Sequence, residues 1–178
     1  MQSFIAMEYL IKNGHKNILL LNGPNKLSSS NHFLKGYLKA LSHYNIEKRE
    51  KLIKHIDITI KDGYNLFKNI YKDKSIVGNI NFTAILTLSD LIAVGVYKAV
   101  SKLNIKIPED YSIIGCDNTL TAEYLYPPLT SVSISKIQTG KKSINILLDR
   151  INNEDHNYKK IILKPKLSKR DSVRTLIN

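Results

Sequence analysis

Short apolar runs that alternate with amphipathic segments constrain this chain more than any other feature. Residues 18–21 read Ile-Leu-Leu-Leu, and residues 82–88 and 111–115 are further runs rich in Ile, Leu and aromatic side chains. Runs of this length are typical of strands buried on both faces of a parallel sheet. Segments with apolar residues at helical spacing separate them, as in repeated strand–helix–strand units. The predicted fold class is therefore α/β, a parallel sheet with helices on both faces.

Turn-forming and capping residues predict where the elements begin and end. Gly14 supplies a left-handed stop for the first helix, and Ser89 or Asp90 caps the helix after the third strand. Helices are predicted over 3–12, after several N-caps at 28–31, from 62 to 70, over 91–103 and over 137–151; strands are predicted over 18–21, 53–60, 82–88, 111–115, 130–134 and 160–163.

The predicted helix over 91–103 carries two apolar faces. One stripe, which includes Ile92 and Val96, can pack on the sheet, whereas a second face holds Leu91, Val94 and Tyr97. A surface helix with one apolar stripe needs only a sheet, so the second face indicates a further partner, here a second subunit. The alternative is that Val94 and Tyr97 merely cover a loop.

Length and composition are those of one globular domain of ordinary size. Apolar residues make up 43% of the 178 residues, and no run is long enough to span a bilayer. A single cysteine excludes an internal disulfide, and the amino terminus lacks a signal-peptide pattern, so a cytoplasmic location is expected. The formal net charge is +12, but 23 of the 27 basic residues are lysines spread along the chain. This favours a diffuse solvated surface over a nucleic-acid footprint.

Residues with catalytic or metal-binding chemistry are scattered. The five histidines show no His-x-x-x-His spacing, and the sequence has neither paired cysteines nor a glycine-rich phosphate loop. Cys116 stands beside Asp117 at a predicted strand end, yet no activating histidine is near it in the sequence. The chain is therefore predicted not to be an enzyme and to use no metal or cofactor.

Five short motifs follow one another along the chain. Gly-His precedes the first apolar run within 14–24, and Leu-Ser-Asp opens 88–95. Pro-Glu-Asp leads to Cys-Asp-Asn within 107–118, Pro-Pro-Leu-Thr begins 127–132, and a closing motif lies at 166–172. In this order and spacing they closely resemble the lactose-repressor (LacI/GalR) family of bacterial transcription regulators, over essentially the whole chain.

Members of that family carry a helix-turn-helix headpiece, a hinge helix and a two-lobed core like a type I periplasmic sugar-binding protein. The resemblance implies that residues 1–133 and 160–178 form the carboxyl-terminal lobe of this core. Residues 134–159 would be a strand–helix segment of the amino-terminal lobe, which is otherwise missing, and the DNA-binding headpiece is absent. The chain therefore resembles a truncated product or a fragment. The helix over 137–151 should dock elsewhere, pair between subunits or be poorly ordered, because its usual partner sheet is missing.

The resemblance also implies a site for a sugar-like or nucleobase-like effector. Asp117 follows a strand, where α/β folds place ligand groups, and matches the family's effector-binding acid; a turn-forming Asp is the alternative. Ser89 stands where the family often has Asn, and Asp90 beside it is expected to cap a helix. Phe33 replaces an effector-binding Arg, although Asn31 or His32 could compensate if the register slips by one residue. Ile58 falls near a position that is aromatic in some relatives. The predicted pocket is less polar than a typical sugar site, so it would take a different effector or none.

Family members dimerise through the helix after the Ser-Asp motif and the segment before Pro-Pro. The resemblance therefore implies a homodimer with an interface that contains Leu91, Val94, Tyr97, Tyr124, Leu125 and Tyr126. The predicted function is the effector-sensing and dimerising part of a transcription regulator, which binds operator DNA only through a headpiece missing from this chain. The alternatives are a truncated or vestigial regulator that acts only by dimerisation, and a solute receptor of the same fold.

Overall fold

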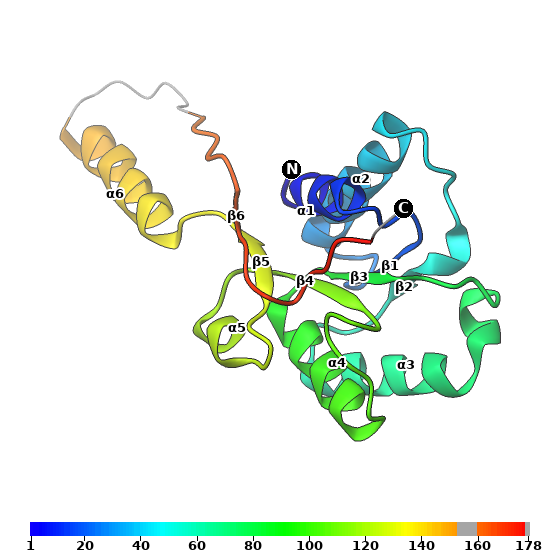
Figure 1. Cartoon of the computed structure of the whole chain (residues 1–178). Helices are drawn as coiled ribbons and strands as arrows, with labels where there is room; N and C mark the ends of the chain where they lie inside the picture. The colour runs from blue at the N-terminus through cyan, green and yellow to red at the C-terminus, as the bar shows by residue number, and fades with distance from the viewer. Residues whose placement is uncertain (153–159, 177–178) are drawn as a thin grey trace.

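A six-stranded sheet lies at the centre of the computed structural model, which describes residues 1–152 and 160–176 (Figure 1). The strand order is β2-β1-β3-β4-β5-β6. Strands β1 to β5 are parallel, whereas β6 runs antiparallel to β5. The strands are β1 (Ile18–Asn22), β2 (Ile53–His55), β3 (Ala84–Thr87), β4 (Ser112–Cys116), β5 (Thr130–Ser133) and β6 (Lys166–Ser168).

Helices cover both faces of this sheet, as the fold class predicts. Figure 1 shows α1 and α2 on one face and α3 and α4 on the other. The helices are α1 (Gln2–Lys12), α2 (Ser28–His43), α3 (Ile60–Lys72), α4 (Asp90–Lys102), α5 (Leu120–Tyr124) and α6 (Lys136–Asn152), with short 3-10 turns η1 (Glu50–Leu52) and η2 (Lys74–Val77). The predicted α/β architecture with a mostly parallel sheet is confirmed.

The three central strands, β1, β3 and β4, are buried along their whole length. Burial on both faces is the physical reason for their continuous apolar sequences. On one face, α3 and α4 approach each other closely at two glycines. A Cβ on Gly63 would lie 2.4 Å from the carbonyl oxygen of Ile92, and a Cβ on Gly95 would lie 2.2 Å from that of Ile60. The two helices can therefore pack this closely only because Gly63 and Gly95 have no side chain.

The strand predicted over 53–60 is too long. β2 ends at His55, and α3 begins at Ile60 rather than at Asp62. The hydroxyl of Thr59 accepts a hydrogen bond from the backbone N–H of Asp62 at 3.0 Å, and this cap fixes the earlier helix start. β2 lies at the edge of the sheet and is only partly buried, so its apolar pattern carries less information than that of the central strands.

Two further predicted elements differ from the structure. α2 starts at Ser28, and the residue at its N-cap position is Leu27, which offers no side-chain cap. All of the caps expected at 28–31 therefore lie inside the first turn of the helix. The strand predicted over 160–163 is wrong. Those residues have no regular structure and line a hollow beside α6, while the strand that pairs with β5 is β6, after Pro165.

Helix α6 stands apart from the rest of the molecule (Figure 1). None of its residues is buried, and Ile137, Ile144 and Ile151 are all exposed. Within the described residues no sheet covers the apolar face of this helix. No helix in those ranges is long and apolar enough to cross a bilayer.

Candidate functional site

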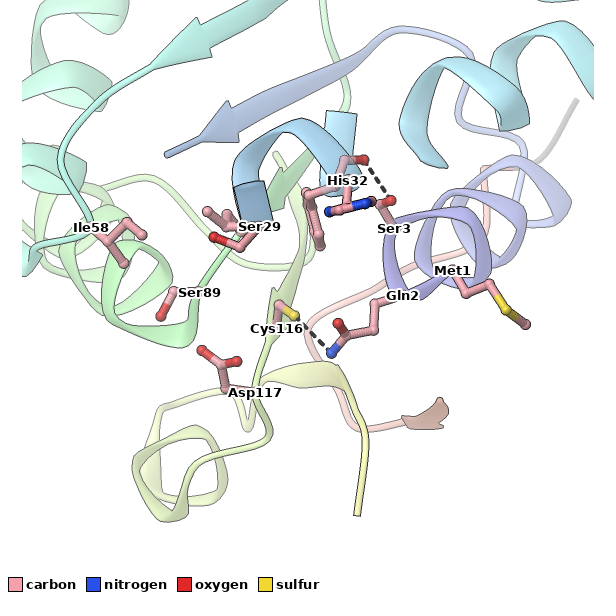
Figure 2. A pocket seen from close by; sticks show the side chains of 11 residues that line it. Met1, Gln2, Ser3, Ser29, His32, Ile58, Ser89, Cys116 and Asp117 are labelled. Carbon is pink, nitrogen blue, oxygen red and sulfur yellow. Dashed lines mark hydrogen bonds between the residues drawn. The ribbon is translucent and has the colours of Figure 1, made fainter. Parts of the chain in front are cut away.

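A cavity of about 270 Å³ lies beside the ends of the central strands (Figure 2). All four residues predicted to contact an effector line it, namely Phe33, Ile58, Ser89 and Asp117. The other lining residues are Met1, Gln2, Ser3, Ser29, His32, Leu88 and Cys116. Residues from five separate segments of the chain are therefore brought together around one space.

The parallel sheet explains why two of the polar residues meet. Strand β3 ends at Thr87 and its neighbour β4 ends at Cys116, so Ser89 and Asp117 leave the sheet at the same edge. Figure 2 shows these two side chains pointing toward one another. The carboxyl ends of parallel strands are the usual place for a ligand in an open α/β fold.

Among the residues that the structure describes, Asp117 is the only acidic one that lines this cavity. Its backbone φ is 106°, a conformation that L side chains rarely adopt, and its side chain is half-buried. Burial raises the pKa of its carboxyl group, the Ser89 hydroxyl lowers it, the Asp90 charge raises it and the Lys136 ammonium lowers it. As a carboxylate, Asp117 accepts hydrogen bonds from ligand hydroxyl or N–H groups.

The apolar part of the wall contains Phe33 and Ile58. Phe33 is held from the backbone side, because the hydroxyl of Ser3 donates to its carbonyl oxygen at 2.6 Å. This contact between α1 and α2 needs Gly36, since a Cβ there would lie 2.1 Å from the Ser3 hydroxyl. The same contact brings the start of α1 to the cavity.

Three polar residues at the cavity, Gln2, Ser3 and Ser29, were not predicted to form part of it, whereas His32 was expected there only as a substitute for the missing Arg. Gln2 lies at the start of α1, and its Nε2 donates to the Cys116 sulfur at 3.3 Å (Figure 2). Ser29 and His32 come from the first turns of α2. The helical pattern of residues 3–12 gave no signal that its amino end faces a cavity. Burial raises the pKa of the Cys116 thiol, which does not favour a nucleophilic thiolate.

Of the two residues predicted as possible caps of α4, Ser89 is the cap and Asp90 is not. The Ser89 hydroxyl accepts from the backbone N–H of Leu91 at 3.3 Å. Asp90 is instead the first residue of the helix, and it is only 1% exposed. Its carboxylate accepts hydrogen bonds from Thr119 and Ser131.

The residues predicted to form a dimer interface differ in exposure. Leu91 and Tyr124 are exposed, and Tyr126 is 95% exposed. Val94 and Leu125 are half-buried.

Tyr97 belongs to the interior rather than to the exposed part of that face. It is 7% exposed, and its hydroxyl donates to the carbonyl oxygen of Pro127 at 3.0 Å. This geometry agrees with the alternative that Tyr97 covers a loop. Leu120, at the start of α5, is 70% exposed and was not predicted as part of the face.

The part of the chain that the structure describes holds no cluster of three His, Cys, Asp or Glu residues suited to a metal ion.

The fold and the cavity at the strand ends define a domain like those of periplasmic binding proteins. Residues 7–173 match the family model described as periplasmic binding protein-like domain. The chain belongs to this family, and over nearly its whole length it is similar to the LacI-family transcription regulators described next.

Two curated relatives are repressors. The chain is 35% identical over 175 residues to the HTH-type transcriptional repressor PurR of Actinobacillus pleuropneumoniae serotype 3 (strain JL03). It is 33% identical over 173 residues to the ribose operon repressor of Haemophilus influenzae (strain ATCC 51907 / DSM 11121 / KW20 / Rd). Each alignment covers 97% of this chain and 51% of the relative, so the chain spans about half the length of these proteins.

Solved structures of LacI-family regulators have the same fold. The Escherichia coli transcriptional repressor ascG superposes with a TM-score of 0.85 at 30% identity, covering 97% of this chain and 61% of that one. A LacI family transcriptional regulator from Enterococcus faecium, solved with bound ribose, superposes with a TM-score of 0.84 at 27% identity and covers 99% and 63%.

Proposed function

We propose that this chain binds a small-molecule effector in the cavity beside β3 and β4, as the sensing and dimerising part of a LacI-family transcription regulator. The observation that carries the proposal is the meeting of Phe33, Ile58, Ser89 and Asp117 around one space. These residues stand far apart in the sequence, and the fold brings them to one cavity. Relatives named as repressors support a regulatory role over a catalytic one.

The lining residues favour a neutral effector with hydrogen-bond donors and an apolar edge. Asp117 accepts from hydroxyl or N–H groups, and Phe33 and Ile58 supply apolar surface. Among the described residues no Lys or Arg lines the cavity, and Lys136, whose ammonium lowers the pKa of Asp117, lines a neighbouring hollow. A phosphate or carboxylate on the effector would face the Asp117 carboxylate inside the cavity, which disfavours an acidic effector. This chemistry fits a sugar-like or nucleobase-like molecule. One solved relative holds ribose and another is a cellobiose complex.

The cavity volume favours a site that is completed by a second wall. Its volume of about 270 Å³ is below the ~300–1,000 Å³ typical of small-molecule sites. We assign residues 1–133 and 160–178 to one lobe, and 134–159 to a segment of a second lobe. The exposed apolar face of α6 supports this assignment, because such a face normally packs against other protein. The chain alone should therefore bind its effector weakly.

The direct test is thermal unfolding of the chain with ribose, cellobiose and free purine bases at millimolar concentrations. A ligand at 100 times its Kd stabilises the folded state by ~2.7 kcal/mol. For a domain of this size that corresponds to a rise in melting temperature of roughly 5–10 °C. A rise with one compound and none with its close analogues supports the sensor. No rise across a broad panel of neutral sugars and bases contradicts it.

We also propose that the chain forms a homodimer through α4 and α5. Leu91, Leu120, Tyr124 and Tyr126 are large apolar or aromatic side chains, and all are exposed. Tyr126 also stands at a hollow of about 640 Å³, so a protruding ring and a recess lie on the same face. A two-fold interface needs such a self-complementary patch, in which one surface meets its own copy. Operator DNA would be contacted by a helix-turn-helix part such as the relatives' names specify, and not by these residues.

The exposed patch also favours the second candidate function, in which the chain acts only by dimerisation. The two candidates differ in the unfolding test, because dimerisation alone gives no ligand-dependent rise. A stable dimer without any ligand response would favour this second function.

A further inference from the structure

The buried carboxylate of Asp90 has a hydrogen-bonding role that neither the cavity nor helix capping explains. Asp90 does not line the cavity, and acidic side chains are almost never this deeply buried without partners. Oδ2 accepts from the backbone N–H of Thr119 at 2.7 Å and from its hydroxyl at 3.0 Å. Oδ1 accepts from the hydroxyl of Ser131 at 2.8 Å. All three donors are neutral groups. The Asp90 carboxylate therefore accepts hydrogen bonds here and does not pair with a cation.

The groups that Asp90 holds belong to the loop directly after Asp117. Asp117 and Asn118 both have positive φ values, 106° and 46°. Such conformations are unfavourable for residues other than glycine, and they persist where surrounding contacts enforce them. Asp90 fixes Thr119 directly. It also fixes Asn118 through Ser131, because the backbone N–H of Asn118 donates to the same Ser131 hydroxyl at 3.0 Å.

Arg170 supports the loop from its other side. One guanidinium nitrogen donates to Oδ1 of Asn118 and to Oε1 of Glu123, both at 2.8 Å. The second donates to the carbonyl oxygen of Leu129 at 2.7 Å. Arg170 therefore binds the side chain of Asn118. Asp90, directly and through Ser131, binds the backbone N–H groups of Thr119 and Asn118, which follow Asp117 in the chain.

Gly115 leaves the space in which the Asp90 carboxylate lies. A Cβ on Gly115 would lie 2.1 Å from Oδ1 of Asp90 and 2.8 Å from the Leu129 side chain. The backbone of Gly115 does not have a positive φ, so the requirement is for space and not for an unusual conformation. Strand β4 therefore carries a glycine one residue before its end so that an acid from α4 can pass beside it.

We propose that Asp90 is the positioning residue for Asp117, and that its two carboxylate oxygens fix the loop 117–119 so that the Asp117 side chain faces the cavity. The inference rests on the proposed function only in giving Asp117 the task of binding an effector. A carboxylate suits this role because it accepts at both oxygens, and hydrogen bonds to a charged acceptor are roughly twice as strong as neutral ones. The amino end of α4 favours the negative charge.

The test uses the whole unliganded chain, so it does not depend on knowing the effector. In Asp90→Asn one oxygen becomes an NH₂ group, and the bonds to Thr119 and Ser131 can no longer all be kept. Amide hydrogen exchange at residues 118 and 119, followed by NMR, should become at least about tenfold faster. Exchange at Leu19 and Leu20 in the central strand should change much less. The Thr119 amide proton should shift upfield as its charged partner is lost.

A second readout is the titration of Asp117 itself, followed through its side-chain carbon by NMR. Burial chiefly, together with the Asp90 charge, raises the pKa of the Asp117 carboxyl group. That pKa should therefore fall in Asp90→Asn, an effect that a general loss of stability would not produce. Asp62→Asn is the matched control, because Asp62 also lies in the first turn of a helix but is far from this loop in the sequence.

Two outcomes would overturn the proposal. One is unchanged exchange at 118 and 119, and the other is an equal increase at every amide, including those of β1. If Asp90→Asn does not fold, Ser131→Ala replaces it. This change removes the Ser131 hydroxyl that links Asp90 to Asn118 but keeps both bonds between Asp90 and Thr119, so it should affect Asn118 more than Thr119. The proposed function fails separately if Asp117→Asn responds to ligands as the unmodified chain does, whatever Asp90 does to the loop.

Discussion

Ser133 and Lys166 face each other across the antiparallel pair of β5 and β6, so the chain leaves the sheet and returns to it at one point. Helix α6 extends from that point, away from the sheet (Figure 1). A short turn between Ser133 and Lys166 could therefore connect β5 to β6 in place of the residues between them.

Replacing residues 134–165 with an Asn-Gly turn should leave a folded protein. Asn-Gly suits a two-residue hairpin between antiparallel strands. The shortened chain should still unfold cooperatively. Its far-UV circular dichroism spectrum should still show the remaining helices and strands. It should also bind less of the dye ANS, because the exposed apolar face of α6 is removed. Loss of cooperative unfolding would show that the removed segment supports the sheet after all.

Asp117→Asn should abolish stabilisation by any compound found in the unfolding test. The amide keeps the shape of the side chain but loses one acceptor and the charge. Without ligand, the melting temperature at neutral pH should be unchanged or higher, because burial disfavours the charged carboxylate. Glu47→Gln, on the exposed surface, is the control for a simple change of charge. An equal ligand response in both variants would remove Asp117 from the binding site.

Leu91→Asp combined with Tyr124→Asp should convert the proposed dimer into monomers. Both side chains are exposed, so the change should not disturb the core. Light scattering after size exclusion should show the mass falling from twice 20.3 kDa to 20.3 kDa. Tyr71→Asp, an exposed aromatic on α3, should leave the dimer intact. A dimer that survives the double change places the interface elsewhere.

The stability of the chain should fall on acidification because of His15. This side chain is fully buried, with Nε2 3.1 Å from the carbonyl oxygen of Arg174, to which it can only donate, and Nδ1 2.8 Å from the Thr83 hydroxyl. Burial lowers the pKa of the imidazole below its ordinary value of 6.5. The unfolded chain therefore binds a proton that the folded chain resists, and stability is lost as the pH falls through about 6.5.

Denaturant unfolding at several values between about pH 7.5 and pH 5 measures this effect. His15→Gln should reduce the pH dependence in that range, although it should also lower stability at pH 7.5 through imperfect packing. His43→Gln, which changes an exposed histidine, should keep the dependence of the unmodified chain. Equal slopes for His15→Gln and the unmodified chain would assign the pH dependence to other groups.

The sequence predicted the central strands well because burial on both faces leaves a continuous apolar pattern, as in residues 18–21. It predicted the edges poorly. β2 has one neighbouring strand and partial burial, so its end could not be located from apolar residues alone. The strand expected at 160–163 has an equally apolar sequence, but no strand lies beside it to pair with. Whether a segment pairs with a neighbouring strand depends on the fold and cannot be predicted from the segment's own sequence.

The candidate site divides in the same way. Asp117 and Ser89 follow strands directly, so general rules for α/β folds predict their position. Gln2 reaches the cavity only because α1 packs against α2 at Gly36, a contact that joins distant parts of the chain. Ser and Asp are both good capping residues, so the sequence could not distinguish Ser89 from Asp90 as the cap. The structure distinguishes them, because the Ser89 hydroxyl caps α4 and the Asp90 carboxylate lies against Gly115 of β4.

The last described residues cross to the edge of the sheet opposite the cavity. The backbone N–H of Arg174 donates to the hydroxyl of Ser112 at the start of β4, and that of Leu176 donates to the carbonyl oxygen of Asn13, which precedes β1. A biotin or surface linker attached beyond Leu176 would therefore hold the molecule with its cavity toward the solution. The same linker at the amino end would join Met1, which lines the cavity, and would compete with the molecules under test.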